Sequence, residues 1–150
     1  MSGKKILVMG LPGSGKSTFS EALQEALRQE GLHISWYNAD YIRKHLNDWD
    51  FSDAGRRRQA ERMTEIARVD NAMGRWVVCD FVCPKREYQD LFDADILIWM
   101  DTIKEGRFED TNKLFEKPKR KNVTYKLSHT LTDDKTKKAA IQVAKKILNS

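Results

Sequence analysis

Residues 10–17 read Gly10-Leu11-Pro12-Gly13-Ser14-Gly15-Lys16-Ser17, which matches the pattern G-x-x-x-x-G-K-[ST] in full, and Thr18 follows. Glycines let backbone N–H groups curve around an anion because no Cβ stands in the way, and a following helix adds its positive N-terminal end. The lysine reaches the β- and γ-phosphates, and the Ser17 hydroxyl ligates Mg²⁺. Although a chance glycine-rich turn is the alternative, the pattern predicts an ATP and Mg²⁺ site contacted by Gly10, Gly13, Ser14, Gly15, Lys16, Ser17 and Thr18.

The segments on either side of this stretch have the patterns of a strand and a helix. Lys5 to Met9 is a continuous apolar run of strand length. Such runs mark strands covered on both faces, so we expect this one to be the central strand of a parallel sheet. From Ser17 to Gln29 apolar residues recur at helical spacing, and Gly31 stands where a helix would end. The context is therefore strand, loop and helix, as a phosphate loop requires.

The rest of the chain continues to alternate between strands and helices. We expect further strands at His33–Tyr37, Trp76–Cys79 and Ile96–Met100, and a weaker one at Val123–Leu127. We expect helices at Tyr41–Leu46, Asp53–Met73 and Pro84–Phe92, and a last one capped by Thr132. The long helix should bury Ala60, Met63, Ile66, Ala67, Val69 and Met73, and the last helix Ala139, Ala140, Val143, Ala144 and Ile147.

This alternation predicts an α/β fold, a three-layer sandwich in which a parallel sheet of about five strands has helices on both faces. With the phosphate loop, it is the P-loop NTPase fold of the nucleotide-kinase kind. A length of 150 residues suits one hydrophobic core, so we expect a single P-loop kinase domain over residues 1–150. In such sheets, ligands bind at the C-terminal ends of the strands, which is where functional residues are expected.

Composition and charge limit which partners and which cellular location can be expected. The formal net charge of +5 suits an enzyme that handles small nucleotides, and it permits nucleic acid as a partner without favouring it. No apolar run approaches the roughly 18 residues of a membrane span, and Met1 to Lys5 leads directly into a strand, so we expect a cytoplasmic location and no membrane partner. Cys79 and Cys83 are expected to be reduced, because no second Cys or His pair has zinc-ligand spacing.

Two aspartates follow predicted strands. Phosphoryl transfer to a hydroxyl calls for a carboxylate within reach of that hydroxyl, and Asp40 is the candidate for this role beside Lys16. The alternative for Asp40 is an N-cap of the helix Tyr41–Leu46. Asp80 is a candidate to hold Mg²⁺ through water, and the alternative is a cap of the next turn.

Several basic and polar side chains share faces with these aspartates. Arg43 lies three residues beyond Asp40, so both can face one site. Arg56 and Gln59 have the same spacing on the long helix, whereas the two arginines between them must point elsewhere. The alternative for all these arginines is a solvated charged face.

The segment at about 104–126 is predicted to be an exposed, mobile lid. From Lys113 to Lys126 it holds six basic residues and one acidic residue. It follows the fourth strand, where it could close over phosphates and exclude water, and a solubilising surface stretch is the alternative. Arg107 and Lys113 are the candidates there to stabilise charge.

Together these motifs resemble those of the adenylylsulfate kinase (APS kinase) family over most of the chain. Gly10–Thr18 is similar to that family's G-L-S-G-x-G-K-S-T, and Asn38–Asn47 is similar to its D-G-D-N-x-R-x-G-L-N. More loosely, Phe51–Arg56 resembles F-S-x-x-D-R, Phe81–Pro84 resembles F-I-S-P, and Asp110–Lys117 resembles the D-P-K-G-L-Y-K-K of the lid.

The resemblance implies a reaction of sulfate assimilation, in which the γ-phosphate of ATP passes to the 3′-hydroxyl of adenosine 5′-phosphosulfate to give PAPS. It implies that Asp40 lies near the acceptor hydroxyl, that Arg43 binds the substrate, and that Phe51 stacks on the substrate adenine. The other substrate-binding residues that it implies are Arg56, Gln59, Phe81, Lys113 and Leu114. It also suggests a homodimer.

The chain departs from the family's pattern at several positions. It has Asn38 for the first Asp of D-G-D and Ala39 for the Gly, Gln59 for an Asn, and Asp80 and Cys83 where the family usually has Ser. After Lys117 it has no counterpart of the family's loop F-T-G-I-D-x-x-Y-E-x-P. Two other functions therefore stay open: a kinase of the same fold that acts on another hydroxyl, of a nucleoside, nucleotide or polynucleotide end, and a non-catalytic nucleotide-binding module.

Overall fold

The computed structural model describes residues 3–129 and 131–150. Met1 and Ser2 lie outside the described residues. They belong to the stretch Met1 to Lys5, on which the expectation of a cytoplasmic location partly depends. The strands are β1 Lys5–Met9, β2 Ile34–Asn38, β3 Trp76–Asp80, β4 Ile96–Met100 and β5 Tyr125–Leu127. The helices are α1 Lys16–Gln29, α2 Ala39–Leu46, α3 Asp53–Ala72, α4 Arg86–Phe92, α5 Glu109–Leu114 and α6 Asp133–Leu148, with a 3-10 turn at Arg120–Asn122.

The five strands form one parallel sheet in the order β2-β3-β1-β4-β5, so β1 is central, as predicted. Because the strands run in one direction, their carboxyl ends meet at one edge. This edge gathers the phosphate loop after β1 and the last residues of β2 and β3. The register places Asn38 directly beside Asp80.

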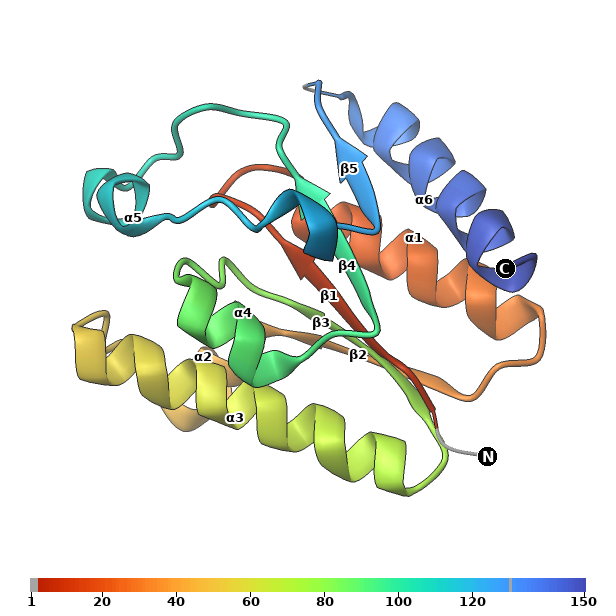
Figure 1. Ribbon diagram of the computed structural model, residues 1–150, viewed down its shortest axis with the longest axis horizontal. Coiled ribbons are helices and arrows are strands. Elements are labelled where there is room, and N and C mark those ends of the chain that lie inside the picture. The colour runs from red at the N-terminus through yellow and green to blue at the C-terminus, as the bar shows by residue number, and fades with distance from the viewer. Residues whose placement is uncertain (1–2, 130) are drawn as a thin grey trace.

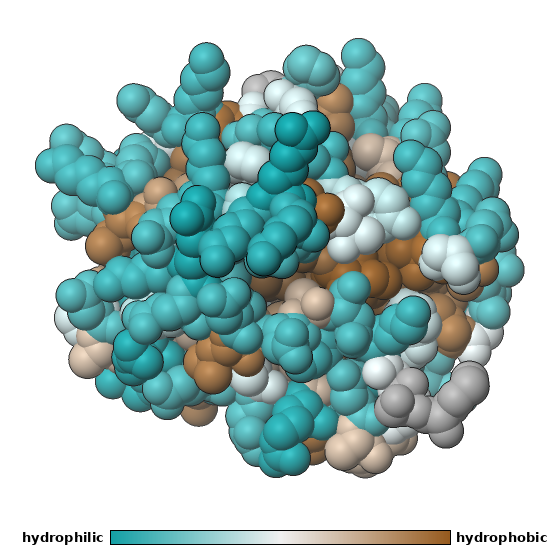
Figure 2. All heavy atoms as spheres, in the orientation of Figure 1, coloured by the Kyte–Doolittle hydropathy of each residue, from teal (hydrophilic) through white to brown (hydrophobic). Residues whose placement is uncertain are grey.

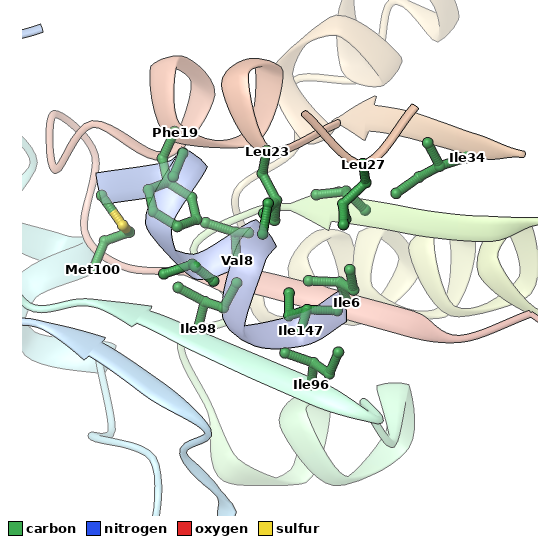
Figure 3. Packing of buried hydrophobic residues seen from close by; sticks show 14 residues of the cluster. Ile6, Val8, Phe19, Leu23, Leu27, Ile34, Ile96, Ile98, Met100 and Ile147 are labelled. Atoms are coloured by element: carbon green, nitrogen blue, oxygen red, sulfur yellow. The ribbon is translucent and has the colours of Figure 1, made fainter. Parts of the chain in front are cut away.

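Helices cover both faces of the sheet (Figure 1). On one face, α1 and α6 pack against β1 and β4, and Figure 3 shows Phe19, Leu23 and Ile147 among the side chains of this cluster. On the other face, α3 and α4 contribute Met63 and Phe92 to a second cluster. The predicted three-layer α/β fold is confirmed.

Two helix ends follow the chemistry expected of them. Gly31 has a φ of 93° and directly follows Glu30, the C-cap residue of α1. Thr132 caps α6, because its Oγ1 accepts a hydrogen bond from Lys135 N at 3.3 Å. Both signals were readable in the sequence, since glycine tolerates positive φ and threonine hydroxyls satisfy the free N–H groups of a first turn.

The buried stripe of α3 differs from the prediction near its end. Val69 and Met73 are 43% and 62% exposed, whereas Asp70 is buried in the stripe. A helical period that passes through Met63 and Ala67 reaches position 70 and misses positions 69 and 73. The Asp70 carboxylate pairs with Arg75 at 3.6 Å, which offsets the cost of burying a charge.

The surface is mostly polar. In Figure 2, hydrophilic side chains cover most of the face shown, and apolar surface is confined to patches between them. Within residues 3–129 and 131–150, no helix combines the length and the apolar character that a membrane crossing needs. Cys79 and Cys83 are both buried free thiols, as predicted.

Candidate active site

The phosphate loop joins β1 to α1 through three glycines in special positions. Gly13 and Gly15 have φ of 87° and 95°, a backbone region that side chains rarely adopt. A Cβ at Gly10 would lie 2.7 Å from the carbonyl oxygen of Met100. Because Gly15 precedes α1 and offers no side-chain cap, the first-turn N–H groups remain available for an anion.

A cleft of about 800 Å³ opens beside this loop. The predicted residues that line it are Gly13, Gly15, Lys16, Ser17, Thr18, Asp40, Arg43, Phe51, Arg56, Gln59, Asp80, Phe81 and Arg107. Gly10, Ser14, Lys113 and Leu114 do not line it. Ser14 supports the loop from behind, because its carbonyl oxygen accepts a hydrogen bond from Thr102 Oγ1 at 2.7 Å.

Lys16 is the first residue of α1 and lines the cleft. Its Nζ donates a hydrogen bond to the carbonyl oxygen of Leu11 at 3.1 Å. Burial lowers the pKa of Lys16 to about 8, although the Asp80 and Asp40 carboxylates act in the opposite direction. A negative charge placed beside it, such as a phosphate, would stabilise the charged form of this ammonium group.

Asp80, the last residue of β3, is a buried carboxylate that is 1% exposed. Its Oδ2 accepts a hydrogen bond from Trp36 Nε1 at 2.6 Å, and its Oδ1 accepts one from Asn38 Nδ2 at 2.9 Å. Burial raises its pKa to about 6, although the Trp36 hydrogen bond, the Lys16 charge and the Asn38 hydrogen bond favour the charged form. Both bonds lead back to β2, so the capping alternative for Asp80 is wrong.

Asn38 makes the contact that sequence reasoning missed. Its Oδ1 accepts a hydrogen bond from Tyr41 N at 3.0 Å, so Asn38 is the N-cap of α2. Its Nδ2 donates to Ser17 Oγ and to Asp80 Oδ1, both at 2.9 Å. The N-cap alternative for Asp40 is therefore wrong, and Asp40 is an exposed first-turn residue that lines the cleft.

Arg43 shapes the far side of the cleft. It is 5% exposed, so it does not belong to a solvated charged face. Its Nη1 donates hydrogen bonds to the carbonyl oxygens of Asp48 and Asp50 at 3.1 and 3.2 Å, and its guanidinium carbon lies 4.5 Å from the ring centroid of Phe51. Arg43 thus fastens the loop that carries Phe51, at the edge of the site.

Arg56 and Gln59 face the cleft from α3, as their spacing predicted. Arg56 Nε donates to the carbonyl oxygen of Phe51 at 2.9 Å, and its Nη2 donates to Thr111 Oγ1 at 3.3 Å. Gln59 is 3% exposed, and its Nε2 donates to the carbonyl oxygen of Ala39 at 3.0 Å. The intervening arginines turn away from the cleft and pair with Glu87, Asp48 and Asp50.

Aromatic side chains line the cleft beside Arg43. Trp49, Phe51 and Phe108 line it while remaining about half exposed. Phe81 is buried below them and packs edge-on against Phe92, with ring centroids 5.9 Å apart. Sequence reasoning missed Trp49 and Phe108, because a single exposed aromatic residue in a polar stretch carries no periodic signal.

The lid-like segment meets the cleft only through its first part. Lys113 is exposed and pairs with Glu109 at 3.6 Å. Beyond α5, Glu116 N donates to the carbonyl oxygen of Pro84 at 2.6 Å, and Gln89 Nε2 donates to the carbonyl oxygen of Glu116 at 3.1 Å. These contacts direct the chain toward α4, so the described lining of the cleft ends at Thr111.

The oxygen atoms on the phosphate side fit a magnesium–nucleotide complex. Among the described residues, no group of three or more His, Cys, Asp or Glu is placed to hold a metal ion alone. In sites that bind nucleotide phosphates, Mg²⁺ uses one or two protein oxygens together with phosphates and water. The Ser17 hydroxyl and the Asp80 carboxylate line the cleft and are oxygen donors of this kind.

Known proteins resemble this chain in sequence and in structure. The model of the family "Adenylylsulphate kinase" matches residues 2–125. The adenylyl-sulfate kinase of Aeromonas salmonicida is 37% identical over 95 residues, which are 61% of this chain and 48% of that protein. The chain spans about half the length of the curated relatives it matches.

Two solved structures show the same fold. An APS kinase of Mycobacterium tuberculosis, in complex with AMPPNP and APS, has a TM-score of 0.73 at 21% identity, covering 96% of this chain and 98% of that chain. A gluconokinase of Sinorhizobium meliloti has a TM-score of 0.68 at 18% identity, covering 96% and 93%. Because the family model spans most of the sequence, the chain belongs to the adenylylsulphate kinase family.

Proposed function

We propose that this protein transfers the γ-phosphate of magnesium-bound ATP to the 3′-hydroxyl of adenosine 5′-phosphosulfate, giving PAPS. The observation that carries the proposal is one continuous cleft, with a phosphate loop at one side and Asp40, Arg43 and Phe51 at the other. The curated relative named above is an adenylyl-sulfate kinase, and that name supplies the acceptor.

Catalysis in this proposal comes from positioning and charge neutralisation, on which phosphoryl transfer mainly depends. The loop N–H groups and Lys16 would hold the β- and γ-phosphates, and Ser17 and Asp80 would hold a magnesium ion, which would supply charge neutralisation at the phosphates. Asp40 is exposed at the start of α2, so it can reach a hydroxyl that enters the cleft and take its proton as the new bond forms.

The acceptor occupies the aromatic side of the cleft. Phe51 offers a half-exposed ring to the adenine, and Arg43 and Arg56 lie against that ring at 4.5 and 5.6 Å from its centroid. Both guanidinium groups keep donors beyond the bonds described above and can meet the anionic phosphosulfate. Lys113 and Leu114 remain predicted substrate contacts, which they can make only if the segment around α5 moves toward the cleft.

Turnover with a panel of acceptors tests the proposal. ADP release from Mg·ATP is measured with adenosine 5′-phosphosulfate, with nucleosides and nucleoside monophosphates, and with a 5′-hydroxyl oligonucleotide. The proposal requires efficient release with adenosine 5′-phosphosulfate and its loss in Asp40→Ala. Activity with another acceptor and none with adenosine 5′-phosphosulfate would refute it.

A second candidate function is phosphorylation of another hydroxyl compound. One observation favours it: the lining of the cleft ends at Thr111, so the acceptor side is not enclosed by residues that follow α5. A steep fall of activity with salt on an oligonucleotide would identify a polynucleotide end as the acceptor. A non-catalytic nucleotide-binding module, the third candidate, would keep its function in Asp40→Ala.

Assembly and location belong to the same proposal. A homodimer is suggested by the resemblance, and light scattering on the purified protein tests it. A cytoplasmic location agrees with two buried thiols that are unpaired, since disulfides are rare in that compartment. Fractionation of cells that express the full-length protein tests the location.

A further inference from the structure

A chain of three hydrogen bonds joins the ends of β2 and β3 to the phosphate loop. It runs from Trp36 Nε1 to Asp80 Oδ2, from Asn38 Nδ2 to Asp80 Oδ1, and from Asn38 Nδ2 to Ser17 Oγ, with lengths of 2.6, 2.9 and 2.9 Å. Trp36 and Asn38 lie two residues apart on β2, so their side chains point to the same face of the sheet. That common direction lets both reach the one carboxylate.

The orientation of the Asn38 amide follows from its partners. Tyr41 offers a backbone N–H, which can only donate, so the amide oxygen must face Tyr41 at 3.0 Å. The amide nitrogen then faces Asp80 and Ser17, and its two hydrogens match two acceptors. Because Ser17 Oγ accepts this bond, the serine's own proton and its other lone pair are free for the phosphate and the cation.

The same geometry decides which residue types can stand together here. A carboxylate at position 38 would meet the Asp80 carboxylate at about the same 2.9 Å, with like charges and no proton between them. The amide at 38 is therefore suited to the acid at 80. The family pattern described above has Asp at the first of these positions and usually Ser at the second, so the chain's two departures together place the acid on β3 instead of on the neighbouring strand β2.

We propose that Asn38 is a positioning residue that couples Ser17 to Asp80. The Ser17 hydroxyl and the Asp80 carboxylate then bind magnesium as one unit, and Asp80 carries the negative charge of that unit. Trp36 holds the other oxygen of the same carboxylate. This inference rests on the part of the proposed function that concerns Mg·ATP, and it does not depend on which acceptor is used.

Exchange of the two side chains tests the coupling. Four proteins are compared: the wild type, Asn38→Asp, Asp80→Asn, and the double variant carrying both substitutions. Aspartate caps helices as well as asparagine does, so Asn38→Asp keeps the cap of α2. The measurements are the thermal midpoint of the nucleotide-free protein without Mg²⁺, and the Mg²⁺ concentration that gives half-maximal ADP binding by calorimetry.

Each single substitution should disturb one measurement, and the exchange should restore both. Asn38→Asp should lower the thermal midpoint by several degrees, because two carboxylates then meet in a buried site. Asp80→Asn should raise the half-maximal Mg²⁺ concentration about tenfold, because the unit loses its charge. The double variant has one acid and one amide in contact again, and the Ser17 hydroxyl can donate to the carboxylate at position 38 instead of accepting from an amide. Both values should therefore return to within about twofold or two degrees of the wild type.

Asn122→Asp is the matched control, because it makes the same chemical change at an exposed position of the 3-10 turn Arg120–Asn122, outside the cleft. It should leave both measurements unchanged. A double variant whose deficits are the sum of the two single ones would overturn the coupling, as would an unchanged midpoint in Asn38→Asp or a wild type whose ADP binding ignores Mg²⁺. Restored Mg²⁺-dependent ADP binding in a protein inactive on adenosine 5′-phosphosulfate would support the coupling and refute only the acceptor.

Trp36→Phe gives an independent arm, because it keeps an aromatic ring and removes the N–H donor. It should raise the half-maximal Mg²⁺ concentration several-fold. Trp76→Phe is its control, since Trp76 lies at the opposite end of β3 from Asp80. Equal behaviour of the two tryptophan variants would contradict the role of Trp36.

Discussion

Burial brings the pKa values of Lys16 and Asp80 toward each other, to about 8 and about 6. Below pH 6 Asp80 takes up a proton and loses its charge, and above pH 8 Lys16 loses its proton and its charge. Both groups are charged only between these limits. We therefore expect calorimetry from pH 5 to 9 to find that the nucleotide-free protein binds Mg·ADP most tightly between pH 6 and 8.

Asp80→Asn separates the two limbs of this profile. The acid limb should disappear, because the group that titrates near pH 6 is gone. The alkaline limb should move to lower pH, because the Asp80 carboxylate raises the pKa of Lys16 more than the Asp40 carboxylate does, and the variant lacks it. An acid limb that persists in Asp80→Asn would assign that limb to another group.

Asp40 is the residue on which turnover should depend most specifically. In Asp40→Asn, kcat should fall by roughly 10²–10⁴-fold, the usual contribution of a positioned acid or base. Mg·ADP affinity should change much less than kcat, because the proposed role of Asp40 is at the acceptor hydroxyl, whereas its effect on Lys16 comes from charge alone. Steady-state kinetics and calorimetry check the two parts, and Asp53→Asn, at an exposed aspartate outside the cleft, is the matched control.

Among single residues, a functional role could be predicted for those that belong to short sequence motifs. The phosphate loop could be assigned because its spacing is fixed by the anion it surrounds. Asn38 and Trp36 could not be assigned as a support for Asp80, because 42 and 44 positions separate them from it in sequence. Only the β2–β3 register makes them neighbours.

Among the elements, the loop between α2 and α3 carries Trp49 and Phe51 and is fastened from both sides. Asp48 accepts hydrogen bonds from Arg58 and from Arg62, which hold the pKa of its carboxyl well below the usual range. Arg62 also donates to Gln59 Oε1. The ion pairs of this loop join it to α3, the helix that carries Arg56 and Gln59, so loop and helix form one wall of the cleft.

Asp48→Ala should loosen the attachment of this loop to α3, because it removes the ion pairs with Arg58 and Arg62, and it should leave the geometry of the phosphate loop unchanged. We expect KM for the acceptor to rise several-fold, because Phe51 is no longer held in place, while the dissociation constant of Mg·ADP stays the same. Glu65→Ala is the matched control, since it removes an ion pair with Arg68 on the exposed face of the same helix. Equal effects on acceptor KM and Mg·ADP affinity would mean that the substitution disturbs the whole fold.

The existence and type of the elements could be predicted because hydrophobic period distinguishes strands from helices. The exceptions arise where a buried position holds a polar group, as Asp70 does in α3, since pattern reasoning assigns burial by hydrophobicity. The position of the segment after Lys113 could not be predicted, because its path depends on single contacts such as that between Glu116 and Pro84.

For the molecule as a whole, the sheet order was not readable from the chain. Alternating strands and helices predict a parallel sheet, but several orders satisfy the same alternation. The order β2-β3-β1-β4-β5 puts β3 between β1 and β2, and this places Asp80 between the phosphate loop and Asn38. The phosphate loop and the residues that follow β2 and β3 thus line one cleft because of strand order, which no local motif encodes.

The two ends of α6 should differ in their importance for the site. A Cβ at Gly15 of the phosphate loop would lie 3.9 Å from Thr136, whereas Ile147 is 11 residues farther along α6, about 16 Å at the rise of a helix, and packs in the core (Figure 3). Ile147→Ala should therefore lower the free energy of unfolding by about 2–5 kcal/mol while leaving the dissociation constant of Mg·ADP unchanged. Denaturant unfolding and calorimetry measure the two quantities.

Ligand stabilisation then provides a check that does not rely on calorimetry. At a ligand concentration 100 times the dissociation constant, binding to the native state alone adds about 2.7 kcal/mol, whatever the intrinsic stability of the protein. Mg·ADP should therefore increase the free energy of unfolding of the wild type and of Ile147→Ala by equal amounts. A smaller increment in the variant would show that packing at the far end of α6 reaches the phosphate loop, because a cavity in the core would then have changed the geometry that binds the phosphates.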